Sequence, residues 1–204
     1  MKLTDIINKT ISVINTLIHT AYYGIITYLE RFYLNATGIK CPKGKFYGWC
    51  SFFRRSGSII RIGKNAKFNY SNWSNHIGLN HRCIISTMSS DAELVIGNNL
   101  GMSSSSITCF KKIEIGNDVR IGANCVIADG DFHLDDPRVG EPVPIRIEDN
   151  VWLGYGVIVM KGVTIGENSI IGMNSVVTKD IPANSIAAGS PAKVVKTINN
   201  QNNV

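Results

Sequence analysis

Acidic residues are missing from a long stretch of this 204-residue chain: none occurs between Glu30 and Asp91. The same stretch is rich in cations, and the whole chain carries a formal charge of +6. Such a block indicates either a solvated basic face or an anionic partner, such as a phosphate compound, a membrane surface or a nucleic acid. Its cations are Arg31, Lys40, Lys43, Lys45, Arg54, Arg55, Arg61, Lys64, Lys67 and Arg82.

Cysteine pairs of the CxxC type and zinc-type cysteine spacings are also absent. The scattered cysteines predict small buried hydrophobic side chains in a reducing cytoplasm. Met1-Lys2 is followed by Asp5 and Lys9 rather than by the apolar core of a signal peptide, so a cytoplasmic location is expected. The cysteines are Cys41, Cys50, Cys83, Cys109 and Cys125.

Residues 1–33 are predicted to form an amphipathic helix, with its regular part from about residue 4. The run without charge between Lys9 and Glu30 raises the question of a membrane span, but Asn15, His19 and several threonines interrupt it. We expect a helix that packs on partner subunits or lies in a membrane interface. Its apolar stripe is Ile7, Ile11, Ile14, Ile18, Ala21, Ile25, Tyr28 and Phe32, and its polar face holds Ser12, Thr16, His19, Thr27 and Glu30.

A basic connector is expected over residues 34–60, and a six-residue period begins after it. Branched side chains recur every six residues, and a second small or branched side chain follows each of them by four. Each hexad supplies one short strand and a corner, and three hexads close a triangular coil that must stack on others to bury its apolar face. The clearest register is Ile147, Leu153, Val159, Ile165, Ile171 and Val177, followed at the fourth place by Val151, Val157, Val163, Ser169, Ser175 and Ile181.

The period is disturbed in three places. It slips by one residue around 102–108, and residues 68–90 fit it poorly, which indicates irregular coils or an early insertion. The ladder also stops after Ile127 and resumes at Ile147, leaving a loop at 129–144 that contains His133 among acidic residues. Loops of this kind on a rigid scaffold frequently carry function.

Residues 115–196 resemble the hexapeptide-repeat acetyltransferases, above all those that modify sugars of bacterial surface polysaccharides. The D-x-D-x-H element at Asp129–His133 and the closing A-G-S-P-A-K at 188–193 carry the resemblance. It implies an all-β solenoid: a left-handed parallel β-helix over residues 61–196, assembled as a homotrimer with sites between chains, and followed by a polar tail at 197–204. No nucleic-acid partner is expected.

The resemblance also implies transfer of an acetyl group from acetyl-CoA to a sugar hydroxyl, without a metal. It places the general base at His133, and imidazole suits the removal of a hydroxyl proton near neutral pH. Glu141 is the first candidate to orient that ring and Asp131 the second. The acceptor sugar is expected to be free, nucleotide-bound or lipid-linked, and peripheral contact with the anionic inner membrane is a further hypothesis.

Similar proteins bind the cofactor at positions that can be matched in this chain. Trp152 would line the cleft near the reactive end, and lysines near the C-terminus would meet phosphates as point charges. One departure is Met102–Ser106, where galactoside and maltose acetyltransferases carry an acceptor-binding Asn, so the acceptor contacts must differ. The matched cofactor positions are Trp152, Gly154, Tyr155, Gly172, Met173, Thr178, Lys179, Lys193 and Lys196.

Three other interpretations stay open at this point. An amino-sugar nucleotide would make the protein an N-acetyltransferase. His76 and His81 have the spacing of two zinc ligands in solenoid carbonic anhydrases of the γ type, but no His lies between His19 and His76 to supply the third. A non-catalytic scaffold would leave His133 unexplained.

Overall fold

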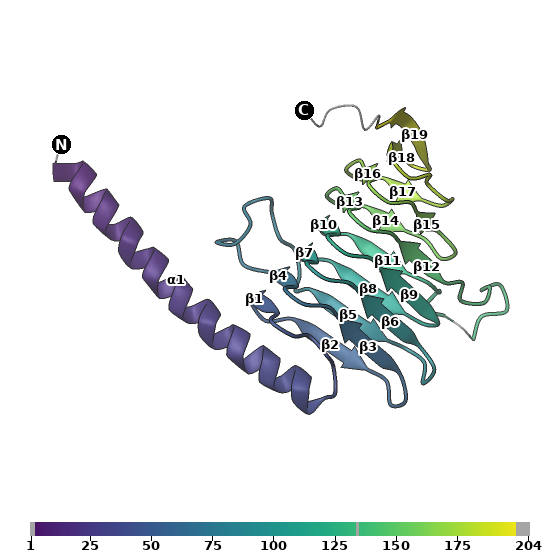
Figure 1. The fold of residues 1–204 in the computed structure, drawn as a ribbon, viewed down its shortest axis with the longest axis horizontal. Helices are drawn as coiled ribbons and strands as arrows, with labels where there is room; N and C mark the ends of the chain where they lie inside the picture. The colour runs from purple at the N-terminus through teal and green to yellow at the C-terminus, as the bar shows by residue number, and fades with distance from the viewer. Residues whose placement is uncertain (1–2, 134, 199–204) are drawn as a thin grey trace.

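The computed structural model describes residues 3–133 and 135–198. A long helix, α1 (Leu3–Ala36), precedes three stacks of short strands (Figure 1). Sheet B consists of β1 (Lys45–Tyr47), β4 (Lys67–Asn69), β7 (Gly101–Ser103), β10 (Arg120–Ala123), β13 (Trp152–Leu153), β16 (Ile170–Ile171), β18 (Ser185–Gly189) and β19 (Ala192–Thr197). Sheet C consists of β2 (Ser51–Arg54), β5 (Ile84–Thr87), β8 (Ser106–Cys109), β11 (Val126–Ala128), β14 (Ile158–Val159) and β17 (Val176–Val177). Sheet A consists of β3 (Ile59–Ile62), β6 (Glu93–Ile96), β9 (Lys112–Ile115), β12 (Ile145–Ile147) and β15 (Thr164–Ile165).

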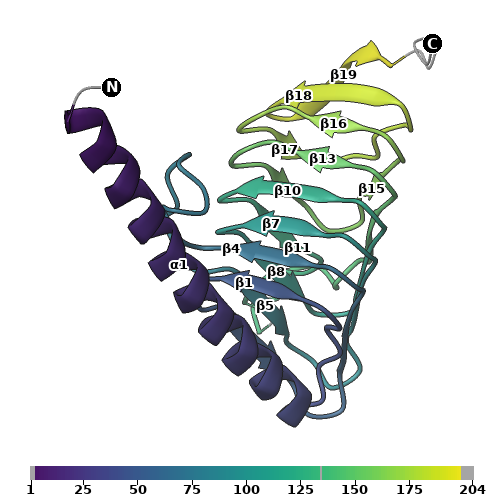
Figure 2. The same cartoon turned by 60° about the vertical axis from the view of Figure 1, so that its left-hand side comes forward.

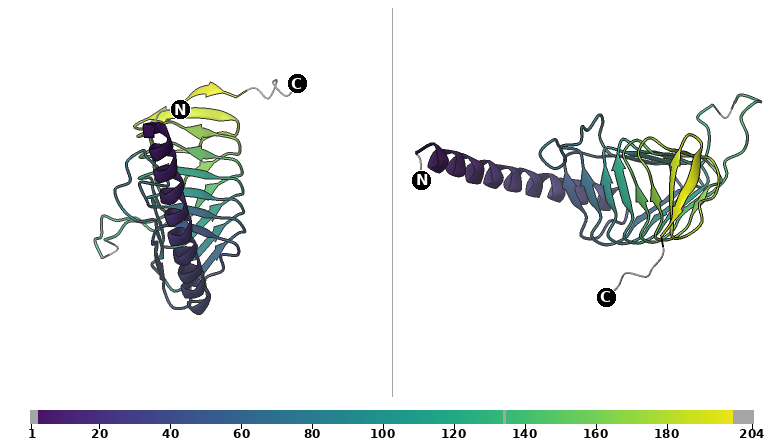
Figure 3. Two further views of the ribbon diagram at one scale, coloured as in Figure 1. Left: turned by 90° about the vertical axis from the view of Figure 1, so that its left-hand side faces the viewer. Right: turned by 90° about the horizontal axis from the view of Figure 1, so that it is seen from above.

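Each strand pairs in parallel with the strand three places along the chain, except that β16 pairs with β18 and the terminal pair β18–β19 is antiparallel. The chain therefore visits sheets B, C and A in turn and winds into a three-sided parallel β-helix (Figure 3). We call the turns between the sheets the BC, CA and AB corners. The predicted solenoid is confirmed at this level.

The core consists of the predicted hexad positions stacked on one another. Every member of the register from Ile147 to Val177 is at most 1% exposed, and the second set four residues later is buried as well. Neighbouring coils align these side chains directly, as Leu153 does with Ile171 and Ile171 with Ala187. Because each coil buries its apolar face only against its neighbours, the stability of the solenoid comes from stacking.

Asparagine forms the AB corner for a physical reason. Asn65, Asn99, Asn150, Asn168 and Asn184 all have positive φ, between 56° and 63°, which asparagine tolerates better than most residues. Their amides also form ladders between coils: Asn65 Nδ2 donates to Asn99 Oδ1 at 3.1 Å, and Asn168 Nδ2 donates to Asn184 Oδ1 at 3.1 Å. The side chain that permits the corner therefore also ties it to the next coil.

The expected connector at 34–60 is wrong in its C-terminal part. β1, β2 and the start of β3 fall within it and form the first coil, which pairs with the second. The period was hidden there because the inward positions are aromatic: Phe46 stacks on Phe68 with ring centroids 5.0 Å apart, and Phe52 lies edge-on to Phe68 at 5.9 Å. The polar tail is shifted too, because Thr197 still belongs to β19, while residues 199–204 lie outside the described part.

The poor fit at 68–90 is an insertion. β4 ends at Asn69 and β5 begins at Ile84, and the segment between them leaves the solenoid towards α1 (Figure 1). It contacts the helix through a hydrogen bond of 2.6 Å between Tyr23 Oη and Ser71 Oγ, and through the rings of His19 and Trp73, whose centroids are 4.0 Å apart. The insertion therefore supports the middle of α1.

The helix packs on the solenoid with its polar side. Thr27 Oγ1 accepts a hydrogen bond of 3.0 Å from the Phe46 amide, and the Glu30 carboxylate accepts one of 2.7 Å from the Cys50 amide, while Ile26 and Leu34 fill the space between. The predicted apolar stripe faces outward instead: Ile18, Ile25 and Phe32 are 59%, 61% and 68% exposed. Towards its N-terminus the helix leans away from the sheets (Figure 2). In the described residues no helix is both long and apolar enough to cross a membrane.

Candidate functional site

The loop at 129–144 projects from the CA corner after β11, and a buried carboxylate fixes its root (Figure 3). Asp129 is fully buried and accepts hydrogen bonds from the amides of Phe110, Lys111 and Lys112 at 2.5, 2.9 and 2.6 Å. Three backbone donors compensate the desolvation of the charge. The first aspartate of the D-x-D-x-H element is therefore an anchor that ties the loop to the coil below.

The next coil holds the loop from the other side. Lys161, which follows β14 at the CA corner, makes an ion pair of 2.6 Å with Asp131 and donates a hydrogen bond of 3.0 Å to the Gly140 carbonyl. The Val143 amide also donates to the Asp129 carbonyl at 2.8 Å. One lysine thus joins the outgoing and returning ends of the loop, a contact that the sequence alone does not predict.

His133 lies on the outer part of this loop and is exposed. Its carbonyl accepts the Asp136 amide at 3.0 Å, and the preceding Phe132 stacks edge-on against Phe110 with ring centroids 5.5 Å apart. These contacts hold the backbone on both sides of the imidazole and leave its ring open to a ligand. Within residues 3–133 and 135–198, neither Asp131 nor Glu141 is hydrogen-bonded to that ring.

The two acidic residues proposed to orient His133 have different surroundings in the structure. The Asp131 carboxylate makes an ion pair with Lys161, and its proposed part in orienting His133 stays a prediction. Glu141 is exposed and lines a pocket of about 330 Å³ beside the loop, together with Asp91, Phe110 and Lys111. Its role towards His133 stays a prediction.

The predicted cofactor positions lie on different edges of the prism. Trp152 is half exposed on the outer face of sheet B, and the BC corner next to it carries Gly154 with Tyr155 and, one coil on, Gly172 with Met173. Tyr155 Oη accepts a hydrogen bond of 2.9 Å from Asn124 Nδ2. Thr178 and Lys179 follow β17 at the CA corner, and Lys193 and Lys196 are exposed on β19.

Within one chain, the structure therefore brings only part of the predicted site together. The loop with His133 shares the CA corner with Thr178 and Lys179, whereas Trp152 and Met173 lie at or near the BC corner, across the width of sheet C. Sites between subunits stay a prediction.

The serine run at 103–106 has a structural role. Ser105 Oγ donates to the Gly122 carbonyl at 2.7 Å and accepts the Cys125 amide at 2.8 Å, and Ser104 is bound to the His81 backbone. His81 itself directs Nδ1 to the Arg82 carbonyl at 2.7 Å. In the described part of the chain, no three His, Cys, Asp or Glu side chains are grouped so that they could hold a metal ion.

Two segments match models of hexapeptide-repeat transferases. Residues 144–179 match "Bacterial transferase hexapeptide (six repeats)", and residues 112–130 match "Hexapeptide repeat of succinyl-transferase". The chain is 43% identical over 93 residues to the galactoside O-acetyltransferase of Escherichia coli (strain K12), covering 44% of this chain and 46% of that protein. It is 47% identical over 92 residues to the galactoside O-acetyltransferase of Lactococcus lactis subsp. lactis, covering 43% and 44%. The matches therefore span less than half of these relatives.

A solved structure extends the likeness over most of the fold. The maltose O-acetyltransferase of Clostridium difficile 630 superposes with a TM-score of 0.52 at 26% identity, covering 90% of this chain and 88% of that one. The fold is a three-sided parallel β-helix, and two of its segments match the hexapeptide repeats of transferases. The resemblance to hexapeptide-repeat acetyltransferases, indicated by the sequence motifs, is confirmed.

Proposed function

We propose that this protein transfers an acetyl group from acetyl-CoA to a hydroxyl of a sugar used in bacterial surface polysaccharide, on a solenoid of left-handed winding. The observation that carries the proposal is the loop at 129–144, which presents His133 at a corner and is fixed from two coils by Asp129 and Lys161. The likeness to sugar O-acetyltransferases supports the reaction class.

The reaction follows from the chemistry of the groups involved. A sugar hydroxyl is too weak an acid to ionise near neutral pH, so the imidazole of His133 takes its proton while the oxygen attacks the thioester carbonyl. The carbon–sulfur bond then breaks, coenzyme A leaves as its thiolate, and the imidazolium returns the proton to sulfur. Because the thiolate is a good leaving group, no covalent enzyme intermediate is needed.

We further propose that the active form is a homotrimer in which sheet C faces the neighbouring chains. The outward side chains of sheet A are mainly charged and paired, as in Lys112–Glu114 at 3.0 Å. The corresponding outward position of sheet C is uncharged and largely apolar: Ile84, Val126 and Ile158 are each 36–37% exposed, with Ser106 between the first two. An apolar sheet face of this kind supports burial against other copies. It would bring the CA corner of one chain next to the BC corner of the next.

The outward stripe of α1 supports contact with a membrane surface. A helix that packs by polar and mixed contacts and exposes isoleucines at helical spacing is suited to insert that stripe among acyl chains. The basic first coils next to the helix suit an anionic surface. We therefore propose peripheral binding at an anionic inner membrane, where a sugar on a lipid carrier would be available.

Thiol release tests the proposed function. Purified protein with acetyl-CoA and a panel of sugars, sugar nucleotides and amino-sugar nucleotides is expected to release coenzyme A with a hydroxyl acceptor, and mass spectrometry is expected to find an acetyl ester in the product. Release only with an amino acceptor, giving an amide, would contradict O-acetylation. No release with any acceptor would contradict the proposed enzyme class.

Flotation with vesicles tests the membrane proposal. The wild-type protein is expected to float with phosphatidylglycerol vesicles, and the variant Ile14→Asp/Ile18→Asp/Ile25→Asp to remain in solution, because it places three charges on the exposed stripe. Thr16→Asp/Thr20→Asp is the control, since it alters other exposed positions of the same helix. Equal partitioning of wild type and stripe variant would overturn the proposal.

A further inference from the structure

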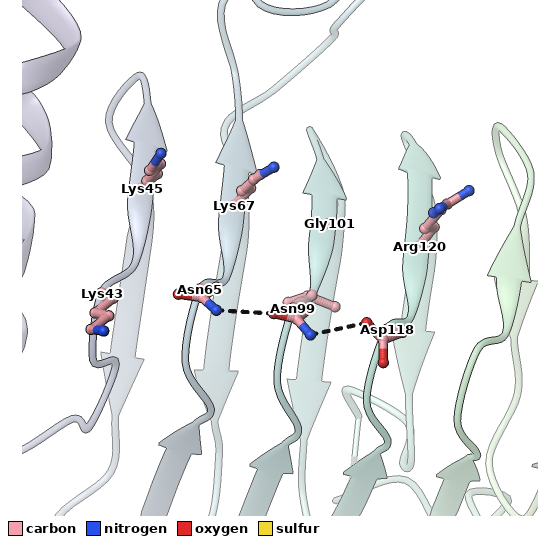
Figure 4. Close-up of a pocket in the computed structure, with 9 residues that line it drawn as sticks. Lys43, Lys45, Asn65, Lys67, Asn99, Gly101, Asp118 and Arg120 are labelled. Carbon is pink, nitrogen blue, oxygen red and sulfur yellow. Dashed lines mark hydrogen bonds between the residues drawn. The ribbon is translucent and has the colours of Figure 1, made fainter.

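The outer face of sheet B carries a row of cations at a single register position. Lys45 is the direct neighbour of Lys67, Lys67 of Gly101, and Gly101 of Arg120 (Figure 4). Since neighbouring strands lie about 4.8 Å apart, the charges stand roughly 5 and 10 Å from one another along the sheet. The side chains of Lys45, Lys67 and Arg120 are all exposed. We call this row, together with Lys43 at the corner beside it, the sheet B cation row.

The sheet B cation row lacks the counter-charges that the other charged face has. On sheet A each outward cation is paired: Arg61 with Glu93 at 2.6 Å, Lys112 with Glu114 at 3.0 Å, and Arg146 with Glu148 at 3.6 Å. In the described part of the chain, Lys45, Lys67 and Arg120 make no ion pair. Like charges directly opposite each other on a sheet are destabilising, so this row costs stability in the absence of an anion.

A pocket lies over the row. It has a volume of about 600 Å³, and Gly101 opens its centre, because nothing lies within 4 Å of the place where a Cβ would be. Four cations and one carboxylate, Asp118, line it, which gives a net charge of four minus one, or +3. The Asp118 carboxylate accepts a hydrogen bond of 3.0 Å from Asn99 Nδ2 in the corner ladder and so is tied to the corner (Figure 4).

The row also leads to the proposed reaction centre. Arg120 pairs directly with Trp152 in the next strand of sheet B, so the pocket ends one coil below the indole expected at the reactive end. A ligand with its phosphates on the cations would therefore extend its remaining part along the sheet towards Trp152. The volume of the pocket lies within the range usual for small-molecule sites.

We propose that the sheet B cation row binds the diphosphate of the carrier to which the acceptor sugar is attached, and so selects a sugar diphosphate ester over a free sugar. This inference rests on the proposed acetyl transfer for its biological meaning. Diphosphate binding is nevertheless a property of the row alone and needs no turnover.

Calorimetric titration with inorganic pyrophosphate tests the proposal. The variant Lys45→Gln/Lys67→Gln is expected to bind at least about tenfold more weakly than wild type, a loss of roughly 1.4 kcal/mol. Its matched control is Lys112→Gln/Arg146→Gln, which removes the same charge from sheet A and is expected to leave the affinity unchanged. An equal loss in both variants, no loss in either, or no binding by wild type would overturn the proposal.

Two further arms identify the ligand. Uridine diphosphate and a short-chain prenyl diphosphate are each titrated against bound pyrophosphate. Stronger displacement by uridine diphosphate indicates a nucleotide carrier. Stronger displacement by the prenyl diphosphate indicates a lipid carrier. Coenzyme A binding is expected to be the same in wild type and Lys45→Gln/Lys67→Gln. A parallel loss of coenzyme A binding would assign the row to the cofactor and contradict the proposal.

The diphosphate site and the proposed acetyl transfer can be contradicted independently of each other. If wild type binds pyrophosphate through the row but releases no thiol with any acceptor, the proposed function fails and the diphosphate site stands. If acetyl transfer occurs with equal KM for free and diphosphate-linked sugars, and Lys45→Gln/Lys67→Gln leaves both values unchanged, the site is wrong and the acetyltransferase stands.

Discussion

At the scale of single residues, the site separates the reacting group from the groups that hold it. His133 is exposed and its ring has no bond to Asp131 or Glu141, whereas Asp129 is buried and saturated with backbone donors. The D-x-D-x-H element therefore combines an anchor, a brace and the proposed general base within five residues. Substitutions at these positions are expected to differ in kind, the first acting on stability and the last on chemistry.

His133→Ala is expected to lower kcat for acetyl transfer by about 10²–10⁴-fold, the usual contribution of a positioned general base. Because the side chain is exposed, the free energy of unfolding is expected to change by less than about 0.5 kcal/mol. Steady-state kinetics and urea unfolding on the same preparation check both points. Unchanged kcat in a folded variant would remove His133 from the mechanism.

Glu30 gives a prediction for the pH dependence of stability. Burial, acting against the hydrogen bond from Cys50 and the charge of Arg82, raises the pKa of its carboxyl above the ordinary value. A raised pKa in the folded state means that the carboxyl favours folding most below its ordinary value and loses that contribution as the pH rises through the raised value. Wild type is therefore expected to lose stability from this group as the pH rises above the ordinary pKa of a glutamate carboxyl.

Glu30→Gln keeps an oxygen that can accept the Cys50 amide and removes the ionisation. It is expected to be more stable than wild type at pH 7, with the difference disappearing near pH 4, as measured by urea unfolding at both values. Glu167→Gln, at an exposed position, is the control and is expected to show no such trend. A Glu30→Gln variant that is less stable at pH 7 would contradict this account.

At the scale of elements, the loop is held by contacts whose strength is modest but whose position matters. The ion pair of Lys161 with Asp131 is partly exposed, so it is worth only about 0.2–1 kcal/mol to stability. It nevertheless joins both ends of the loop that carries the base, and a displacement of about 1 Å in a reacting group can cost up to roughly 10²-fold in rate.

Lys161→Met is therefore expected to reduce kcat by roughly ten- to a hundredfold while unfolding stability falls by less than about 1 kcal/mol. Arg61→Met is the matched control, because it breaks a comparable ion pair, with Glu93 at 2.6 Å, on sheet A away from the loop. Equal activities of the two variants would show that the Lys161 brace has no part in positioning His133.

How far the sequence predicts these elements depends on the side chain at the inward position. Where Ile, Leu or Val fills it, as from Ile147 to Val177, the period of six was enough to place each strand. Where Phe46 and Phe52 fill it, the sequence predicts a connector instead of a coil, because aromatic residues in a basic segment do not show the hexad pattern.

The packing of α1 could not be predicted either. An apolar stripe usually faces the core, but Thr27 and Glu30 bind backbone amides of the first coil and turn the stripe outward.

The sequence predicts the loop that forms the candidate site, but not the contacts that hold this loop in place. The interruption of the hexads marked residues 129–144, and the chemistry of imidazole marked His133. The partner of Asp131 lies thirty positions away in sequence, and only the rise of one coil brings Lys161 beside it. The sheet B cation row depends on register in the same way, since Arg120 aligns with Lys45 and Lys67 only once the insertion at 70–83 is known.

At the scale of the whole molecule, the solenoid has three unlike faces. Sheet A is charged and internally paired, sheet B carries cations beside Trp152 that make no ion pair with the described residues, and sheet C presents a largely apolar row with Ile84, Val126 and Ile158. Association through sheet C would leave the other two faces at the outside of the assembly and place the loop of each chain against the BC corner of its neighbour.

Ile158→Lys is expected to dissociate the trimer, because a charge placed in the middle of an apolar interface opposes burial of all three copies. Thr164→Lys, at an outward position of sheet A, is expected to leave the trimer intact. Size-exclusion chromatography with light scattering measures both masses. A trimer of Ile158→Lys together with a monomer of Thr164→Lys would show that sheet A forms the interface instead.

The most direct test of a site shared between chains is complementation. His133→Ala, with a defective loop, and Trp152→Ala/Met173→Asp, with a defective BC corner, are each expected to be inactive as homotrimers. Trimers assembled from an equal mixture are expected to recover about a quarter of wild-type activity, because an intact loop and an intact corner meet with independent chances of about one half each. Mixed trimers, verified by native mass spectrometry, that remain inactive would contradict the shared site.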